Sequence, residues 1–132
     1  MMSKTWLEKY NNSKDPVVKT IDKPWLGFRE GSKMLISSPA EIDDYIRKIP
    51  AGKTVTVEKL RKDLAIKHGA DFTCPLTTGI FLRIVAEKSF EELNKDKIEV
   101  APFWRIIDPG SKLASKLSFG PDFIVQMRKK SV

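Results

Sequence analysis

The chain has 132 residues, of which 41% are hydrophobic and 31% are charged, a composition typical of one globular domain and unlike that of disordered chains. No apolar stretch approaches the length of a membrane span, the first residues lack an apolar secretory core, and a single cysteine cannot form an internal disulfide. We therefore expect a cytoplasmic protein with one core and no membrane contact.

The formal net charge is +7, and lysine and arginine outnumber aspartate and glutamate most strongly in residues 100–132, by six to two. A basic surface suits a polyanion, because neutralising phosphates releases counterions. The same charge also suits a solvated surface without a ligand. Net charge alone therefore leaves nucleic acid as one candidate partner.

The N-terminal region, residues 1–37, contains polar runs such as Asn11–Pro16, and regular structure there is expected to be short. Trp6, Trp25 and Phe28 supply apolar groups that can hold this region against a core. The sequence therefore predicts an irregular arm over residues 1–37, packed on a domain formed by residues 38–132.

A first helix is predicted from Ser38, where a serine cap, Pro39 at the first helical position and Glu41 three residues after the cap form a start signal. Apolar residues follow at three- and four-residue spacing as far as Ile49. Pro50-Ala51-Gly52 then ends the helix.

Two further helices follow after short connections. One is predicted over residues 57–67, with Thr56 as its cap and His68-Gly69 as its terminator, and a longer one from Pro75 to about Leu93. A pair of helices joined by a tight turn is typical of a helix-turn-helix, and it is equally compatible with any small helical core.

The pattern then changes to that of strands. Residues 98–107 are apolar and aromatic enough for a central strand, and Asp108-Pro109-Gly110 is a turn signal. Residues 111–117 are either the return strand of a hairpin or an exposed basic loop, and Gly120-Pro121-Asp122 opens a last helix. The predicted fold class is α+β.

Two motifs separated by the predicted helices carry a family resemblance: Ile49-Pro50-Ala51-Gly52-Lys53-Thr54 and Pro102-Phe103-Trp104-Arg105-Ile106-Ile107. Together they resemble the C-terminal domain of alkylguanine-DNA alkyltransferases (methylated-DNA–protein-cysteine methyltransferases) and their non-transferring alkyltransferase-like relatives. The similarity covers roughly residues 40–126. It implies a winged helix-turn-helix domain with a short β-hairpin wing, and a role in DNA binding and DNA repair.

The resemblance fails at the catalytic residues. The family pattern Pro-Cys-His-Arg-Val corresponds to Pro102-Phe103-Trp104-Arg105-Ile106, so that Phe103 stands where the nucleophilic cysteine is expected and Trp104 where the histidine is expected. Val57 stands for the family tyrosine, and the base-replacing arginine has no equivalent near residues 76–78. No alkyl transfer, no catalytic residue and no cofactor are therefore expected. Arg105, whose family counterpart is largely structural, is retained, and core packing is favoured for both aromatic residues over stacking on an extruded base.

The resemblance thus predicts a non-catalytic DNA-binding protein, with modified or distorted DNA as a candidate ligand. Its contacts are expected from the two helices after Gly52 and from the wing. The candidate residues are Lys53, Lys59, Arg61, Lys62, Thr77, Thr78, Arg83, Lys112 and Lys116.

Two other functions remain open. Cys74 begins a helix and could be the nucleophile of a thiol enzyme with His68 nearby, although a buried or half-buried structural cysteine is the favoured interpretation. Alternatively, the scaffold is a protein-interaction module that uses the acidic residues 87–92. One histidine and one cysteine are too few for a metal site, and no glycine-rich phosphate loop is present.

Overall fold

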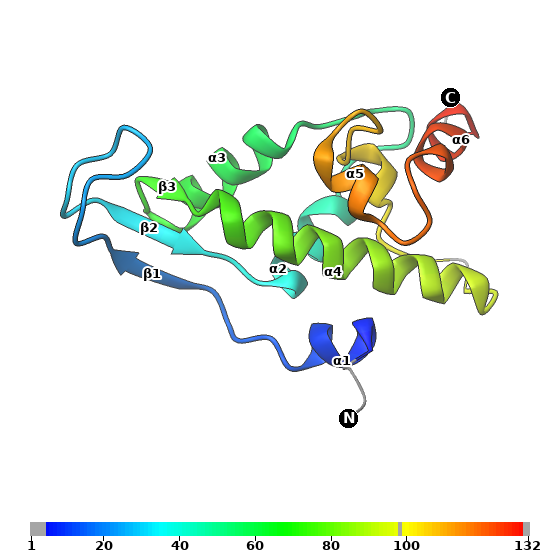
Figure 1. Ribbon diagram of the computed structural model, residues 1–132, viewed down its shortest axis with the longest axis horizontal. Coiled ribbons are helices and arrows are strands. Elements are labelled where there is room, and N and C mark those ends of the chain that lie inside the picture. Colours follow the sequence, from blue (N-terminus) through cyan, green and yellow to red (C-terminus); the bar gives the residue numbers. More distant parts are fainter. Residues whose placement is uncertain (1–4, 98, 131–132) are drawn as a thin grey trace.

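The computed structural model describes residues 5–97 and 99–130, which form an α+β fold of helices with a small sheet at one end (Figure 1). In chain order the elements are α1 (Trp6–Asn11), β1 (Val17–Thr20), β2 (Lys33–Ile36), α2 (Pro39–Arg47), α3 (Val57–His68), β3 (Phe72–Thr73), α4 (Pro75–Asn94), the 3₁₀ turn η1 (Phe103–Arg105), α5 (Lys112–Lys116) and α6 (Asp122–Lys130).

The sheet has the strand order β1-β2-β3. Strand β1 pairs antiparallel with β2, with Val17 opposite Ile36, and β2 pairs parallel with β3, with Met34 opposite Phe72. Every residue of β1 is exposed, whereas Leu35 of β2 is fully buried. The predicted arm therefore contains a helix and two strands, and its second strand contributes to the core.

Side chains at the predicted caps explain where α2 and α3 begin. The Ser38 hydroxyl accepts a hydrogen bond from the Glu41 amide at 3.1 Å, and the Thr56 hydroxyl accepts one from the Lys59 amide at 3.1 Å. Helix α3 ends at Gly69, whose φ of 66° lies in the left-handed region that glycine adopts freely. The predicted starts of both helices are confirmed.

Helix α4 is the central element of the molecule (Figure 1). Helix α1 packs against it from one side, and α2 and η1 also contact it. Apolar side chains from β2 to α6 meet around it in one cluster, in which Leu35, Leu82, Phe103 and Ile124 are fully buried. Segments far apart in the sequence thus share a single core.

The predicted strand over residues 101–107 is wrong. Pro102 has no amide hydrogen for a ladder, and six of these seven residues are buried. The backbone instead turns, with the Arg105 amide bonded to the Pro102 carbonyl at 3.0 Å. Because the core encloses the segment, apolar residues occur at successive positions without the alternation of a half-exposed strand. Ile98, where this strand was predicted to begin, lies outside the described residues.

The predicted β-hairpin wing is also wrong. Residues 108–111 do form the turn, closed by the Ser111 amide on the Asp108 carbonyl at 3.0 Å. The chain then enters α5, because the Ser111 hydroxyl caps the Ala114 amide at 3.2 Å and Leu113, Ala114 and Leu117 turn toward the core at helical spacing. The described part of residues 98–132 contains no strand.

Candidate functional site

The two sequence motifs meet in space at Arg105. Its Nη1 donates a hydrogen bond to the Ile49 carbonyl at 2.8 Å, and its own carbonyl accepts one from the Val55 amide at 2.8 Å. These bonds fix the loop between α2 and α3 against the segment around η1. The structural role that the resemblance implies for Arg105 is the role that its contacts give it here.

Phe103, at the expected nucleophile position, is fully buried. Its ring packs among those of Trp104, Phe119 and Phe123, with centroid distances of 5.3, 5.4 and 6.0 Å. Trp104 is also buried, and its carbonyl accepts a hydrogen bond from Arg128 Nε at 2.7 Å. Core packing, the favoured interpretation of these two residues, is confirmed.

A cavity of about 470 Å³ lies beside this segment, where the N-terminal ends of α3 and α4 face residues 106–113. We call it the first cavity. Buried apolar side chains form its floor, and exposed polar ones surround its mouth. The floor includes Leu82, Ile106 and Ile107; the mouth includes Thr54, Thr56, Glu58 and Asp108.

Arg128 of α6 also lines the first cavity, where it is bonded to the 104–107 segment. Its Nη2 donates to the Ile107 carbonyl at 3.1 Å in addition to the bond from Nε to Trp104. The sequence reasoning missed this residue as part of a site. The available signal was helical spacing, because Arg128 follows the buried Ile124 by four residues and so lies on the same face of α6.

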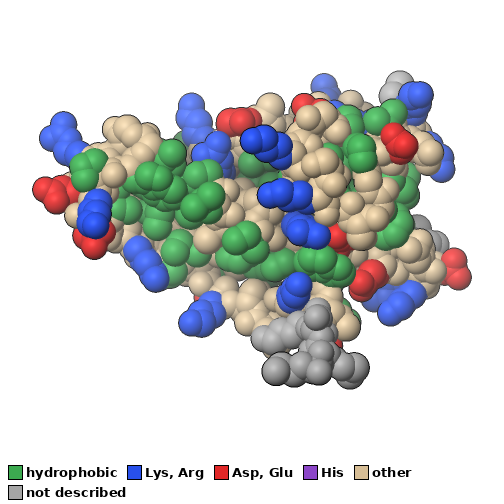
Figure 2. Space-filling model, in the orientation of Figure 1, with side chains coloured by type: hydrophobic (Ala, Val, Ile, Leu, Met, Phe, Trp, Pro, Cys, Tyr) green, Lys and Arg blue, Asp and Glu red, His purple; other side chains and the backbone are tan. Residues whose placement is uncertain are grey.

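Five of the basic candidates either line the first cavity or are next to a lining residue in the chain. Arg61 lines it, and Lys53, Lys59, Lys62 and Lys112 are each next to a lining residue in the chain. All four lysines are exposed, and Lys59 Nζ also pairs with Asp63 at 2.9 Å. Figure 2 shows lysine and arginine side chains over α3 and α5 on one face of the molecule.

No family model, curated protein or solved structure matches this chain. The family resemblance therefore rests on the residues of the two motifs and on their order along the chain.

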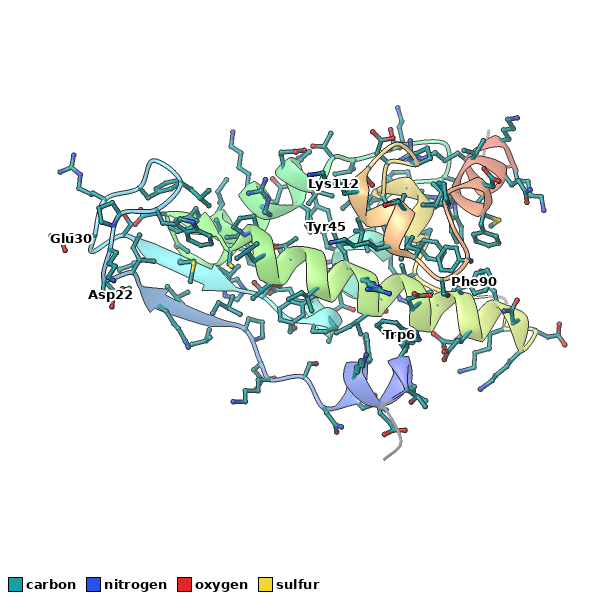
Figure 3. All side chains as sticks on the ribbon, viewed as in Figure 1. Trp6, Asp22, Glu30, Tyr45, Phe90 and Lys112 are labelled. Carbon is teal, nitrogen blue, oxygen red and sulfur yellow. The ribbon has the colours of Figure 1, made fainter. Side chains whose placement is uncertain are left out.

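The other four candidates differ in accessibility and in place. Thr78 is fully buried and its hydroxyl donates to the Cys74 carbonyl at 2.7 Å, so it cannot contact DNA; Thr77 is only partly exposed. Arg83 faces α1, where its guanidinium lies 5.2 Å from the Trp6 ring centroid. Figure 3 shows Trp6 and Lys112 on opposite sides of α4. Lys116 is exposed at the end of α5.

The thiol candidate is enclosed. Cys74 is 5% exposed, and its amide donates to the Leu35 carbonyl at 2.9 Å. His68 lies within hydrogen-bonding distance of a different group, with Nε2 at 2.6 Å from Glu41 Oε2. Burial alone would raise the pKa of Glu41, but hydrogen bonds from His68, Ser37 and Lys67 outweigh it and lower that pKa. The imidazole of His68 therefore links the C-terminal end of α3 to α2.

The acidic residues of α4 are used within the molecule. Glu87 is fully buried, and its carboxylate accepts hydrogen bonds from the amide and hydroxyl of Ser118. Glu92 pairs with Lys88 at 2.9 Å and with Lys97 at 3.1 Å. An interaction surface over residues 87–92 would therefore lack Glu87. Glu92 could bind a partner only by breaking its ion pairs with Lys88 and Lys97.

Residues 5–97 and 99–130 contain neither a group of metal-ligating side chains nor a membrane-crossing helix. None of their His, Cys, Asp and Glu side chains form a group of three or more that could hold a metal ion. None of their helices has both the length and the apolar composition that a membrane crossing requires.

Proposed function

We propose that the chain is a non-catalytic DNA-binding protein that accepts modified or distorted DNA, with the first cavity receiving a displaced base. One observation carries the proposal. Arg61 lines a cavity with an apolar floor, and Lys53, Lys59, Lys62 and Lys112 stand next to its lining residues in the chain. Such a site offers charge to a phosphate backbone and apolar surface to a base.

The chemistry of each part fits this ligand. Arg61 in the lining and the exposed lysines of the neighbouring chain positions can neutralise phosphates and release counterions, which gives affinity without sequence preference. The buried floor offers van der Waals contact to the face of a base, while Thr54 and Asp108 add a few polar groups that can orient it. The volume of about 470 Å³ lies within the range of small-ligand sites, roughly 300–1,000 Å³.

Binding without a covalent reaction is proposed because neither residue position that could supply a nucleophile offers an accessible one. A phenylalanine stands at the expected nucleophile and is fully buried, and the described thiol, Cys74, is buried as well. The proposal therefore assigns recognition to the site and no covalent step.

The test is binding of fluorescently labelled DNA, followed by anisotropy and by gel shift at several salt concentrations. We expect tighter binding to a duplex with one unpaired base than to a fully paired duplex, and a steep loss of affinity with added salt. Lys112→Glu and Lys116→Glu should weaken binding of every sequence, and each should change the slope of log K against log salt by about 1.

Lys95→Glu is the matched control, because it makes the same charge change at the exposed C-terminal end of α4, away from the first cavity. It should reduce affinity less than Lys112→Glu. Absence of a gel shift at low salt, together with unchanged tryptophan fluorescence on titration with DNA, would remove the proposed function.

A further inference from the structure

A second cavity adjoins the first along α3. It has a volume of about 420 Å³ and is bounded by the loop between β1 and β2, by α3 and by β3. Its walls are largely apolar and aromatic, and two cations lie at its edge. The residues concerned are Phe28, Ala65, Ile66, Ala70 and Phe72, with Arg61 and Lys62.

The aromatic wall of the second cavity is held firmly. The Phe28 ring stacks on that of Phe72, with centroids 4.3 Å apart and planes at 13°, and Trp25 meets Phe72 edge-on at 6.1 Å. Two backbone hydrogen bonds of 2.8 Å join Trp25 and Phe28 across a turn. Leu26 and Gly27 both have positive φ in that turn, which is the geometry of a tight hairpin. Figure 3 shows this loop, with Asp22 and Glu30, extending from the sheet.

The two cavities are joined by shared residues. Glu58 and Arg61 line both of them, so Arg61 belongs to the boundary that the two cavities share. Lys62 adds a second cation at the edge of the second cavity. Asp71, which also lines it, has its carboxylate bonded to the Lys33 amide at 2.8 Å. A ligand that crosses Arg61 can therefore enter both cavities.

We propose that the second cavity binds a further unstacked base of the same DNA strand, so that the preferred ligand is DNA with consecutive unpaired nucleotides. The inference rests on the proposed function and names its substrate class. Aromatic side chains bind successive bases of single-stranded segments by stacking, and arginine between them contacts the connecting phosphate. Phe28 gives the N-terminal region a direct part in that binding.

Aromatic surface and continuity favour nucleic acid over an apolar protein segment as the occupant. Arg61 and Lys62 are balanced in formal charge by Glu58 and Asp71, but Asp71 is bonded to the Lys33 amide, and the wall contains the rings of Phe28 and Phe72, against which a base can pack. The second cavity also adjoins the first, with which it shares Glu58 and Arg61. One strand with bases on either side of Arg61 satisfies both cavities.

The experiment compares three DNA probes of equal length with the full chain at low salt: a paired duplex, a duplex with one unpaired nucleotide, and a duplex with a short loop of consecutive unpaired nucleotides. Phe28→Leu removes the aromatic face and keeps apolar volume, whereas Ala70→Leu fills the second cavity without changing charge. Leu7→Ala, at an exposed apolar position of α1 outside both cavities, is the matched control.

The wild-type chain is expected to bind the looped duplex most tightly. Phe28→Leu and Ala70→Leu should each weaken binding of the looped duplex about tenfold while leaving the duplex with one unpaired nucleotide unchanged. A 2-aminopurine base in the loop should lose fluorescence on binding to wild-type protein, and this quenching should be smaller with Phe28→Leu. Thermal unfolding of each variant checks that it folds, and the two variants perturb the cavity independently.

Three results would overturn the inference. The first is equal affinity of the wild-type chain for the one-base and looped duplexes. The second is unchanged binding of the looped duplex by folded Phe28→Leu or Ala70→Leu protein, which would favour an apolar side chain of a protein partner as the occupant of the second cavity. An equal loss for all three probes would indicate a structural effect only. In each of these cases DNA binding by the wild-type chain leaves the proposed function standing, whereas absence of all DNA binding removes both.

Discussion

Glu58 is the residue at which the proposed ligand and the observed charges conflict. Its side chain is exposed, it lines both cavities, and it follows the Thr56 cap within the first turn of α3, where a carboxylate is favourable to the helix. A phosphate passing Arg61 would approach this carboxylate. The residue thus supports the helix at the expense of affinity for an anion.

We therefore expect Glu58→Gln to bind DNA about two- to fivefold more tightly at low salt, the size of effect typical of one exposed charge interaction. The gain should shrink as salt is added, because screening weakens the repulsion that the substitution removes. Anisotropy titrations measure it. Glu91→Gln, near the far end of α4, is the control, and an equal gain in that variant would show that only net charge matters.

Glu41 provides a pH-dependent contribution to stability. Its carboxylate joins α2 to the end of α3 through His68, Lys67 and Ser37, at 2.6, 3.1 and 2.7 Å. These partners lower its pKa below the usual value of 4.5 despite burial. A lowered pKa means that the folded state binds fewer protons than the unfolded state, so the stabilisation is complete above the unfolded pKa and is lost as the pH falls through the folded one.

The predicted effect of Glu41→Gln is a loss of about 1–3 kcal/mol in the free energy of unfolding at neutral pH, since a carboxylate with several hydrogen-bond donors is neutralised. The difference from wild type should narrow as the pH falls below the usual pKa of 4.5 and through the lowered pKa of the folded state. Urea denaturation at a series of pH values measures both. A difference that stays constant into acid would show that the charge of Glu41 contributes nothing.

At the scale of elements, α1 is the most weakly held helix. It has six residues and none of them is buried. Its Trp6 ring lies 5.2 Å from the guanidinium of Arg83 in α4 and 4.2 Å from Lys9 Nζ within α1 itself. Helix α4 has fully buried residues such as Leu82, Val85 and Ala86 along its length. Cation–π contacts of this kind contribute about 0.5–1 kcal/mol each at exposed sites.

Hydrogen exchange should separate these two helices. We expect the amides of Lys9 and Asn12, which bond to carbonyls of Thr5 and Glu8, to exchange at least about a hundredfold faster than those near Leu82, because short exposed segments open without global unfolding. Trp6→Ala should accelerate the α1 amides further and leave those of α4 unchanged. Similar protection in both helices would mean that α1 opens only with the core.

The helices show what sequence patterns can predict. Side-chain caps act within four residues, so Ser38 and Thr56 identify the starts of α2 and α3, and Gly69 marks an end through its own backbone freedom. The segment around Phe103 and Trp104 could not be predicted in this way, because burial on all sides removes the alternation that distinguishes a strand. Strands β1 and β2 depend on pairing between residues 17–20 and 33–36, which no local pattern specifies.

The candidate site was predicted in part for the same reason. Basic residues of α3 such as Lys59 and Lys62 could be selected from the sequence because their exposure follows from helical spacing. Thr78 could not be excluded, since its burial depends on how α4 packs against the core. Phe28 was assigned only to packing, because its position beside α3 depends on stacking with Phe72 across more than forty residues.

At the scale of the whole molecule, the described residues form one core. The buried cluster takes side chains from Leu35 in β2 to Ile124 in α6, and Cys74 lies where β3 passes into α4, with its amide bonded to Leu35. A chain of this length with one shared core is expected to unfold cooperatively, because removing any large part of the cluster exposes the rest. Cys74 is then a reporter of the whole fold.

We therefore expect a thiol reagent to label native Cys74 at least about a thousandfold more slowly than the same chain in denaturant, since 5% exposure requires opening of the core before reaction. With added urea, the labelling rate should rise in parallel with loss of helical circular dichroism, because one transition controls both. The chain in concentrated urea supplies the reference rate for an accessible thiol. Rapid labelling of the folded chain would contradict the burial of Cys74 and would restore the thiol enzyme as a competing function.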